Sequence, residues 1–258
     1  MKKTSTLIKL TSAVILPLFI ASCDGGGGDN DNDGEALNLR AQPAFPTNVT
    51  IEASGPITFN DGIFFTHNGT VDIFDTGSPA SEMIMRAAEI GDVSSSLSIF
   101  STFDSTQFRD VELLTFIRLE PGNSETRTLN FSEGARYFSF TFQAVPSSDT
   151  FIGNDDPLEF DVYQMLQDSP DGTVTIEVTQ LFDAGTEVND FLTSNGNEFI
   201  AGLPEGDPEA GEDENGVITL HTPTFYDEYL NPGDFDVSTL NPGGTVVARI
   251  TFTRTDTQ

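Results

Sequence analysis

Two acidic stretches of this chain carry side chains that could hold a metal ion. The first is the loop Ser147-Ser-Asp-Thr-Phe-Ile-Gly153, which places one carboxylate beside an aromatic and an aliphatic residue. The second is Asp183-Ala-Gly-Thr-Glu187, which has a carboxylate at each end. Carboxylate oxygens are ligands that hard cations such as calcium prefer. If both stretches reach the same end of a sheet, they could form a calcium site.

Each acidic stretch follows a segment with the pattern of a β-strand. In residues 136–145, Phe138, Phe140, Phe142 and Ala144 alternate with polar residues, which predicts a half-buried strand. Residues 173–182 are rich in Val, Ile and Thr and run directly into the second stretch, so we expect a second long strand there. Two such strands would bring both acidic loops to one end of a sheet.

The two stretches also resemble a known family. Pro146-Ser-Ser-Asp-Thr-Phe-Ile-Gly153, followed by Asp183-Ala-Gly-Thr-Glu187, is similar to the paired motifs of the spondin N-terminal domain. This module is shared by F-spondin and mindin, and bacterial secreted proteins carry it too. The upstream segment from His67 to Asp92 resembles the bacterial branch of the family. The resemblance covers roughly Val49 to Phe252.

The resemblance implies a C2-like β-sandwich that holds Ca²⁺ between its two motif loops. Asp149 matches the loop aspartate of the family, Asp183 the first acid of the second motif, and Glu187 the second acid. Glu187 replaces the more usual aspartate, which lengthens the side chain by one methylene and could change how it binds the ion. Three carboxylates with backbone carbonyls and water would satisfy a shell of six to eight oxygens.

Simpler roles for these residues stay open at this point. The chain has 41 acidic residues, so some will flank strand ends by chance, and Asp149 could instead cap a turn. Phe151 and Ile152 are expected to anchor their loop in the core. A membrane-inserting tip, as in lipid-binding C2 domains, is the alternative, and the negative charge of the chain disfavours it.

The first 22 residues have the composition of an export signal. Lys2 and Lys3 precede an apolar run, residues 10–20, that is too short to span a bilayer. The sequence Ile20-Ala-Ser-Cys23 resembles a bacterial lipobox, in which the cysteine is lipidated and becomes the first residue of the mature protein. We therefore expect an exported lipoprotein of the bacterial cell envelope, attached to a membrane through a lipid on Cys23.

Residues 23–42 are expected to be a flexible, acidic, Gly-rich linker, and residues 43–258 a single domain. The stretch Asp29-Asn-Asp-Asn-Asp-Gly34 has the spacing of the first half of an EF-hand loop. Position twelve of that loop would be Arg40 instead of Glu, and no helix pattern flanks it. The linker is therefore expected to be a solvated tether.

The domain is predicted to be all-β, a sandwich of about eight strands with one inserted amphipathic helix. Turn signals such as Asn60-Asp-Gly62 separate short apolar runs, as in β-sandwiches. Ser78 is the expected N-cap of the helix, Gly91 its end, and its apolar residues recur at helical spacing: Ala80, Met83, Ile84, Ala87 and Ala88. Residues 154–172 are expected to be an acidic loop with a short apolar patch.

Charge excludes one class of partner. The net charge is −30, and beyond the first 22 residues eight arginines face 41 acids, a net charge of −33. Such a surface repels phosphate backbones, so we expect no nucleic-acid binding. His67 and His221 are the only histidines, and with one cysteine in the chain they are expected to be packed, hydrogen-bonded side chains and not zinc ligands.

The sequence carries no recognisable catalytic motif, and we expect a binding protein and not an enzyme. The favoured function is a calcium-binding, envelope-anchored binding or adhesion module whose partner is an extracellular glycan or protein. One alternative is a secreted carbohydrate-active hydrolase that uses two of the carboxylates. Another is a purely structural envelope lipoprotein.

Overall fold

The computed structural model describes most of the chain that follows the linker. The described residues are 39–41, 43–55, 57–94, 96, 100, 106–115, 118–145, 147–188, 212–221 and 246–256. They belong to one compact unit, Ala36–Gln258. The predicted export signal, Cys23 and the EF-hand-like stretch lie outside the described residues.

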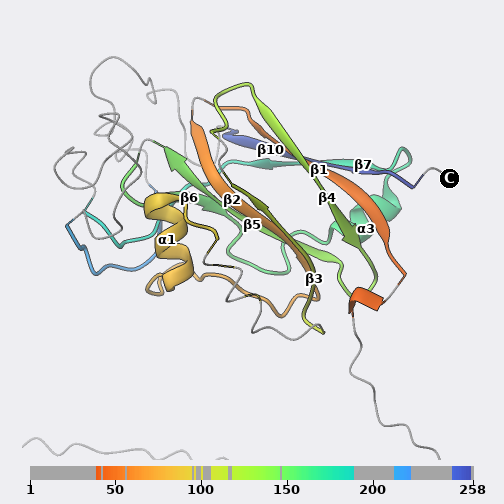
Figure 1. Cartoon of the computed structure of the whole chain (residues 1–258), viewed down its shortest axis with the longest axis horizontal. Coiled ribbons are helices and arrows are strands. Elements are labelled where there is room, and N and C mark those ends of the chain that lie inside the picture. Colours follow the sequence, from red (N-terminus) through yellow and green to blue (C-terminus); the bar gives the residue numbers. More distant parts are fainter. Residues whose placement is uncertain are drawn as a thin grey trace, which may run out of the picture. The chain divides into compact units, whose positions relative to one another are not determined.

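Two antiparallel sheets form a sandwich, as the sequence predicted (Figure 1). The four-stranded sheet has the order β4 (Ser124–Phe131), β1 (Phe45–Ala53), β10 (Ala248–Arg254) and β7 (Thr173–Val178). The six-stranded sheet has the order β3 (Phe108–Leu114), β2 (Thr58–His67), β5 (Tyr137–Val145), β6 (Thr150–Gly153), β8 (Phe182–Asp183) and β9 (Thr219–Leu220). The central strand pair β2–β5 therefore lies well inside the larger sheet.

The main core lies between the two sheets and is built mostly from phenylalanine. Phe138, Phe140 and Phe142 of β5 belong to it, together with Ile250 and Phe252 of β10. The rings of Phe138 and Phe252 meet edge to face, with centroids 4.8 Å apart. This is a favoured arrangement of aromatic pairs, and it joins strands from the two sheets.

The outer face of the six-stranded sheet is buried as well, which the alternating pattern of β5 did not predict. Helix α1 (Glu82–Ile90) contributes Met83 and Ile84 to a second core on this face. The polar side chains of β5 that alternate with its phenylalanines are consequently almost fully buried. Gln143 is satisfied there, because its Nε2 donates to the carbonyl of Glu89 at 2.7 Å. The expectation of a half-buried strand was wrong.

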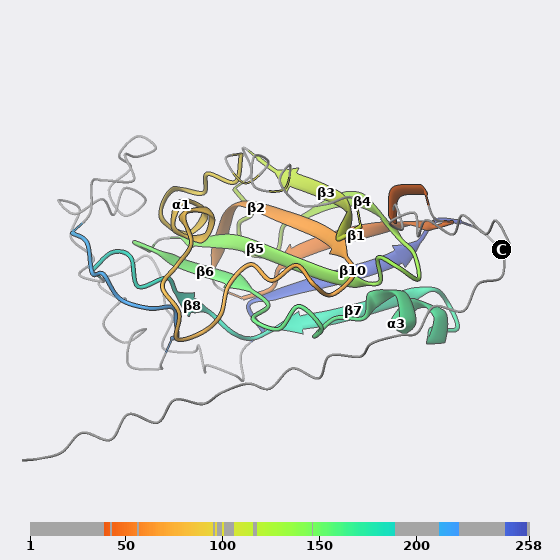
Figure 2. The same ribbon diagram turned by 90° about the horizontal axis from the view of Figure 1, so that it is seen from below.

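The helix α1 ends where the sequence predicted and begins later. Gly91 follows its last turn in the left-handed conformation, with φ 66°, which favours glycine. The N-cap is Ser81 and not Ser78, and its hydroxyl accepts a hydrogen bond from the backbone of Ile84. A second helix, α3 (Val162–Asp168), lies in the stretch expected to be a loop. Figures 1 and 2 place α1 and α3 at opposite ends of the sandwich.

The Asn60-Asp-Gly62 signal marks a bulge and not a hairpin turn. Strand β2 runs through these residues without reversing, and its pairing with β5 shifts register between Phe59 and Gly62. A Cβ atom at Gly62 would lie 2.0 Å from the ring of Phe142, so glycine is required for the ring to pack against the backbone.

The expected strand from Thr173 to Phe182 is divided between the two sheets. β7 pairs with β10 in the four-stranded sheet, whereas β8 pairs with β6 in the six-stranded sheet. The chain crosses from one sheet to the other at residues 179–181. The second acidic stretch therefore reaches β6 through a crossover and not as the end of one long strand.

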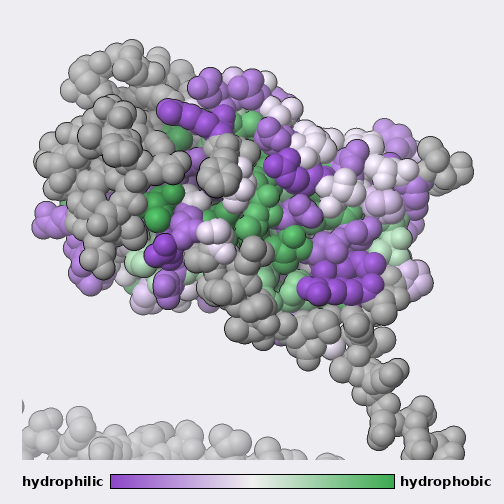
Figure 3. Space-filling view, viewed as in Figure 1, coloured by the Kyte–Doolittle hydropathy of each residue, from purple (hydrophilic) through white to green (hydrophobic). Residues whose placement is uncertain are grey.

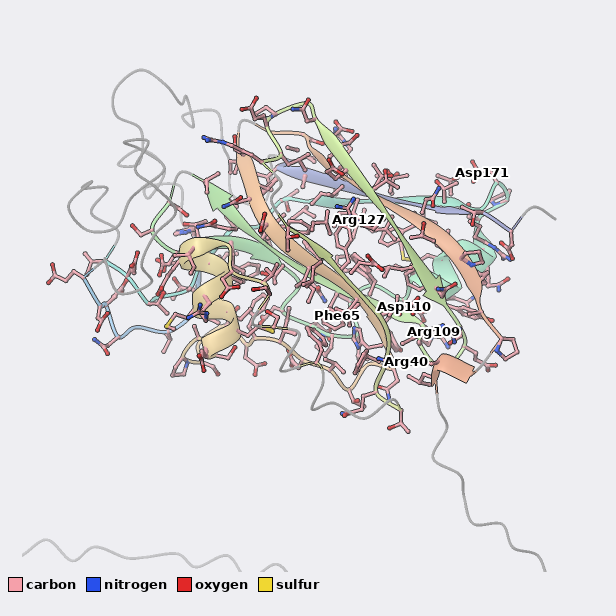
Figure 4. The ribbon with its side chains drawn as sticks, viewed as in Figure 1. Arg40, Phe65, Arg109, Asp110, Arg127 and Asp171 are labelled. Atoms are coloured by element: carbon pink, nitrogen blue, oxygen red, sulfur yellow. The ribbon has the colours of Figure 1, made fainter. Side chains whose placement is uncertain are left out.

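The compact unit begins earlier than residue 43, where the sequence placed the domain boundary. Leu39 is buried, and the short 3-10 helix η1 (Leu39–Ala41) contacts β3. Arg109 donates to the carbonyl of Leu39, and the Cζ atom of Arg40 lies 5.0 Å from the centroid of the Phe108 ring. Arg40 and Arg109 lie close together in Figure 4. These contacts hold residues 39–41 against β3.

Few apolar side chains of the described residues reach the surface. Leu158, Val217 and Leu220 are the large hydrophobic residues among them that are exposed. Hydrophilic residues cover much of the face seen in Figure 3, with apolar ones between them. Within the described part of the chain, no helix is long and apolar enough to cross a membrane.

Candidate functional site

Asp149 is completely buried at the turn between β5 and β6. Its Oδ2 atom accepts three hydrogen bonds from the second acidic stretch. The donors are the backbone N–H of Thr186 at 2.8 Å, the backbone N–H of Glu187 at 3.1 Å and the hydroxyl of Thr186 at 3.2 Å. A single carboxylate oxygen therefore holds together two turns that lie 37 residues apart in sequence.

Asp183 lies directly beside this turn. In the pairing of β6 with β8, Thr150 is the register partner of Asp183, and the backbone N–H of Ala184 donates to the carbonyl of Asp149 at 3.1 Å. The Oδ1 atom of Asp183 accepts a hydrogen bond from the backbone N–H of Gly185 at 2.7 Å. The structure thus brings Asp149 and Asp183 to the same end of the sandwich.

The environment of Asp149 disfavours its ionised form. Burial raises the pKa of Asp149 to about 7, and the nearby negative charge of Asp183 adds to the increase. The hydrogen bonds from Glu187 and Thr186 act in the opposite direction and stabilise the carboxylate. The other carboxylate oxygen, Oδ1, is buried and accepts no hydrogen bond. An acceptor of this kind is costly unless a cation or donor reaches it.

Glu187 contributes its backbone to the same arrangement. It is only 5% exposed, and it forms an isolated antiparallel bridge with Asp213. Among the described residues, no group of three or more His, Cys, Asp or Glu side chains is arranged to hold a metal ion. A calcium ion at this place would therefore need oxygens from backbone carbonyls or water in addition to the carboxylates.

The oxygens present fit a hard cation. Asp149 offers the Oδ1 atom that accepts no hydrogen bond, and Asp183 brings a second carboxylate close enough to raise the pKa of the first. A divalent cation would relieve both the repulsion of the two charges and the unsatisfied acceptor. The two-aspartate core of the predicted calcium site is therefore chemically suitable.

The backbone around the second motif requires a glycine at position 185. Gly185 has φ 66°, and a Cβ atom there would lie 2.6 Å from the carbonyl oxygen of Val217. The segment 212–218 passes this close because its backbone bonds to the motif loop: Gly216 N–H donates to the carbonyl of Gly185 at 2.7 Å, and Glu214 N–H to that of Thr186 at 2.9 Å. The loop that bonds to Asp149 is thus fixed from its other side as well.

Glu89 is a second buried acid near this loop, and the sequence pattern did not predict its burial. It lies on α1 beside residues expected to face solvent, yet it is only 7% exposed. Burial raises the pKa of Glu89 to about 7, the charge of Asp213 raises it further, and a hydrogen bond with the side chain of Thr186 opposes both. Thr186 therefore contacts both buried acids, Asp149 and Glu89.

Both histidines are buried and hydrogen-bonded, as expected. The Nε2 of His67 lies 3.0 Å from the hydroxyl of Ser139, and its Nδ1 accepts from the backbone N–H of Gly69 at 3.1 Å. The Nε2 of His221 lies 2.8 Å from the hydroxyl of Thr150. Burial lowers the pKa of His67 to about 4 and that of His221 to about 3.

Phe151 and Ile152 are core residues of β6. Neither side chain is exposed, and they belong to the two different cores on opposite faces of the sheet. The ring of Phe151 meets that of Phe74 edge to face, with centroids 5.0 Å apart. They are loop anchors, as expected, and the alternative of a membrane-inserting tip at these residues is wrong.

Neither a scan of protein-family models nor a search of curated proteins returned a match for this chain. The resemblance to the spondin N-terminal domain therefore rests on the two motifs, on the upstream segment from His67 to Asp92 and on their order in the sequence.

Proposed function

We propose that this protein is a calcium-binding module of the spondin N-terminal type that acts in recognition or adhesion at the bacterial cell envelope. The observation that carries the proposal is the buried Oδ1 atom of Asp149, which accepts no hydrogen bond although Asp183 places a second carboxylate beside it. Calcium would supply the positive charge that this pair of acids requires. Glu187 is proposed as a further ligand on the basis of the motif alone.

The residues around the site define what binding would achieve. Asp149 already connects the β5–β6 turn to the loop 183–187, and segment 212–218 bonds to the other side of that loop. Neutralising the two aspartates would remove the repulsion that opposes this arrangement. Binding would therefore rigidify three segments at one end of the sandwich, where a recognition surface would benefit from fixed loops.

The location and partner belong to the same proposal. An export signal with a lipobox would attach the protein to a membrane through Cys23, and the linker would separate the sandwich from the lipid surface. The recognised partner would be an extracellular glycan or protein. The hydrolase alternative gains no support from the Asp149–Asp183 pair, because Asp149 is completely buried and cannot contact a polymeric substrate.

Thermal unfolding with and without calcium tests the proposal. Extracellular calcium modules bind with a Kd of roughly 10⁻⁴–10⁻³ M, so about 10 mM calcium should stabilise the fold by about 1.4–2.7 kcal/mol and raise Tm by several degrees. Asp183→Asn should abolish this shift. Asp168→Asn, an exposed position on α3 at the opposite end, should retain it.

The control solution must contain NaCl at the same ionic strength, because screening alone should stabilise a chain with 41 acidic residues. If exhaustive chelation and added calcium give the same Tm for the unmodified chain, the proposal is wrong.

A further inference from the structure

A cavity of about 850 Å³ opens beside the candidate calcium loops, between α1 and the segments that bond to one another at residues 185–186 and 213–216. Pro79, Ala80 and Met85 contribute apolar side chains to its lining. Gly185 and Thr186 line it as well, and segment 212–218 bonds to the backbone of both. The lining therefore combines apolar side chains with polar groups.

The charged residues of the lining are mostly acidic. Glu82, Glu89 and Asp213 line the cavity, and Arg86 is the basic residue among its described lining residues. Arg86 already forms an ion pair with Asp92, whose Oδ2 lies 2.6 Å from the Nη2 atom. Because that pair compensates its charge, the three acids leave the cavity with a net negative charge.

Glu89 gives this acidic cavity a specific acceptor. The Glu89 residue is only 7% exposed. Its Oε2 atom accepts no hydrogen bond within the protein. A buried carboxylate oxygen in this state requires a donor, and a charged donor would stabilise it most.

We propose that this cavity binds the cationic side chain of a basic segment on a partner protein, with the ammonium or guanidinium group at Glu89 and Asp213 and the aliphatic stem against Pro79, Ala80 and Met85. Lysine and arginine combine a long apolar stem with a charged head, and this matches a lining that has both apolar and acidic side chains. The proposal does not require calcium at Asp149.

Titration of the ¹⁵N-labelled chain with Nα-acetyl-lysinamide and Nα-acetyl-argininamide, followed by NMR in chelator and about 0.15 M NaCl, tests this proposal. Both probes should cause saturable shifts at residues 185, 186 and 213–216. Glu89→Gln should weaken binding at least about tenfold, because it removes one charged partner of a buried pair. Asp213→Asn should also weaken binding of the probes. Asp213 is an exposed lining residue, so this substitution does not disturb the core.

The matched control is Glu120→Gln, which removes the same charge from an exposed turn of the chain. If Glu120→Gln weakens binding as much as Glu89→Gln, the probes respond only to the net charge and the proposal is wrong. Equal binding of the uncharged Nα-acetyl-norleucinamide would also contradict it. Saturable, Glu89-dependent binding of glucosamine without binding of the lysine probe would assign the cavity to an amino sugar and overturn the proposed partner.

Discussion

At the scale of single residues, burial raises the pKa values of the acids Asp149 and Glu89 to about 7, and Thr186 contacts both side chains. Each has one carboxylate oxygen that accepts no hydrogen bond. A purely structural buried acid would normally have both oxygens satisfied, so these two atoms are the places at which we expect ligands.

His67 provides a residue-scale prediction about pH. Above pH 6.5 the imidazole is neutral in both folded and unfolded chains. Between pH 6.5 and about 4 only the unfolded chain takes up the proton, so acid favours unfolding. From pH 7.5 to 4.5 this residue should cost roughly 2.5 kcal/mol of stability. Urea unfolding of the parent chain and of His67→Gln at both pH values measures this contribution of His67. The other titrating groups are common to both proteins, so their effects cancel in the comparison.

Between pH 7.5 and pH 4.5 the parent chain should lose roughly 2.5 kcal/mol more stability than His67→Gln. Equal losses in the two proteins would mean that the folded ring takes up its proton as readily as the unfolded one.

At the scale of elements, the crossover between β7 and β8 positions the site. The segment that follows β7 leaves the four-stranded sheet, and β8 then pairs with β6 so that Asp183 lies opposite Thr150. The sequence predicted that the two acidic loops meet, and this is confirmed, but it predicted a single strand across residues 173–182. Local propensity cannot reveal such a division, because both pieces have strand composition and only tertiary pairing separates them.

Other elements show the same limit of sequence patterns. The alternation in β5 correctly identified the face that points between the sheets. It could not reveal that α1 covers the opposite face, because the residues there are polar and satisfied by tertiary partners such as the carbonyl of Glu89. Helix α3 was missed because it has seven residues and buries only Val162 and Leu166, too short a pattern to show a helical period.

Gly185 provides a prediction at this scale, with Gly122 as its matched control. Both have positive φ, but a Cβ atom at Gly122 would meet nothing within 4 Å, whereas one at Gly185 would clash with the backbone of Val217. Gly122→Ala should cost about 1–2 kcal/mol from its backbone conformation alone. Gly185→Ala should cost at least about 2 kcal/mol more, because rigid backbone must move. Urea unfolding compares the two.

Equal costs for the two variants would show that segment 212–218 does not press against the motif loop. A calcium titration of Gly185→Ala should also show a lower calcium affinity, because displacement of this loop would move Asp183 away from Asp149.

At the scale of the whole molecule, acidic charge dominates. Five ion pairs among the described residues engage Arg86, Arg127, Arg136, Arg249 and Arg254. With eight arginines against 41 acids beyond residue 22, there are too few basic residues to pair with most of the acids. Such a chain repels anionic surfaces, so attachment to a membrane would require the lipid proposed on Cys23 and would not come from the surface of the sandwich.

Cys23→Ser tests that attachment in a bacterial expression host. Metabolic labelling with a palmitate analogue should mark the parent chain and not the variant, because the thiol is the proposed site of lipidation. The parent chain should also sediment with membranes, whereas the variant should be soluble after export. Labelling of Cys23→Ser, or equal sedimentation of both proteins, would contradict a lipid anchor at this residue.

The central claim is that one ion joins the turn at Asp149 to the loop at Asp183. A crystal structure grown with calcium, with anomalous scattering recorded at long wavelength, tests it most directly. The account predicts an anomalous peak within about 2.3–2.6 Å of Asp149 Oδ1 and of the Asp183 carboxylate. A map without a peak at this place, from crystals grown in saturating calcium, would contradict it.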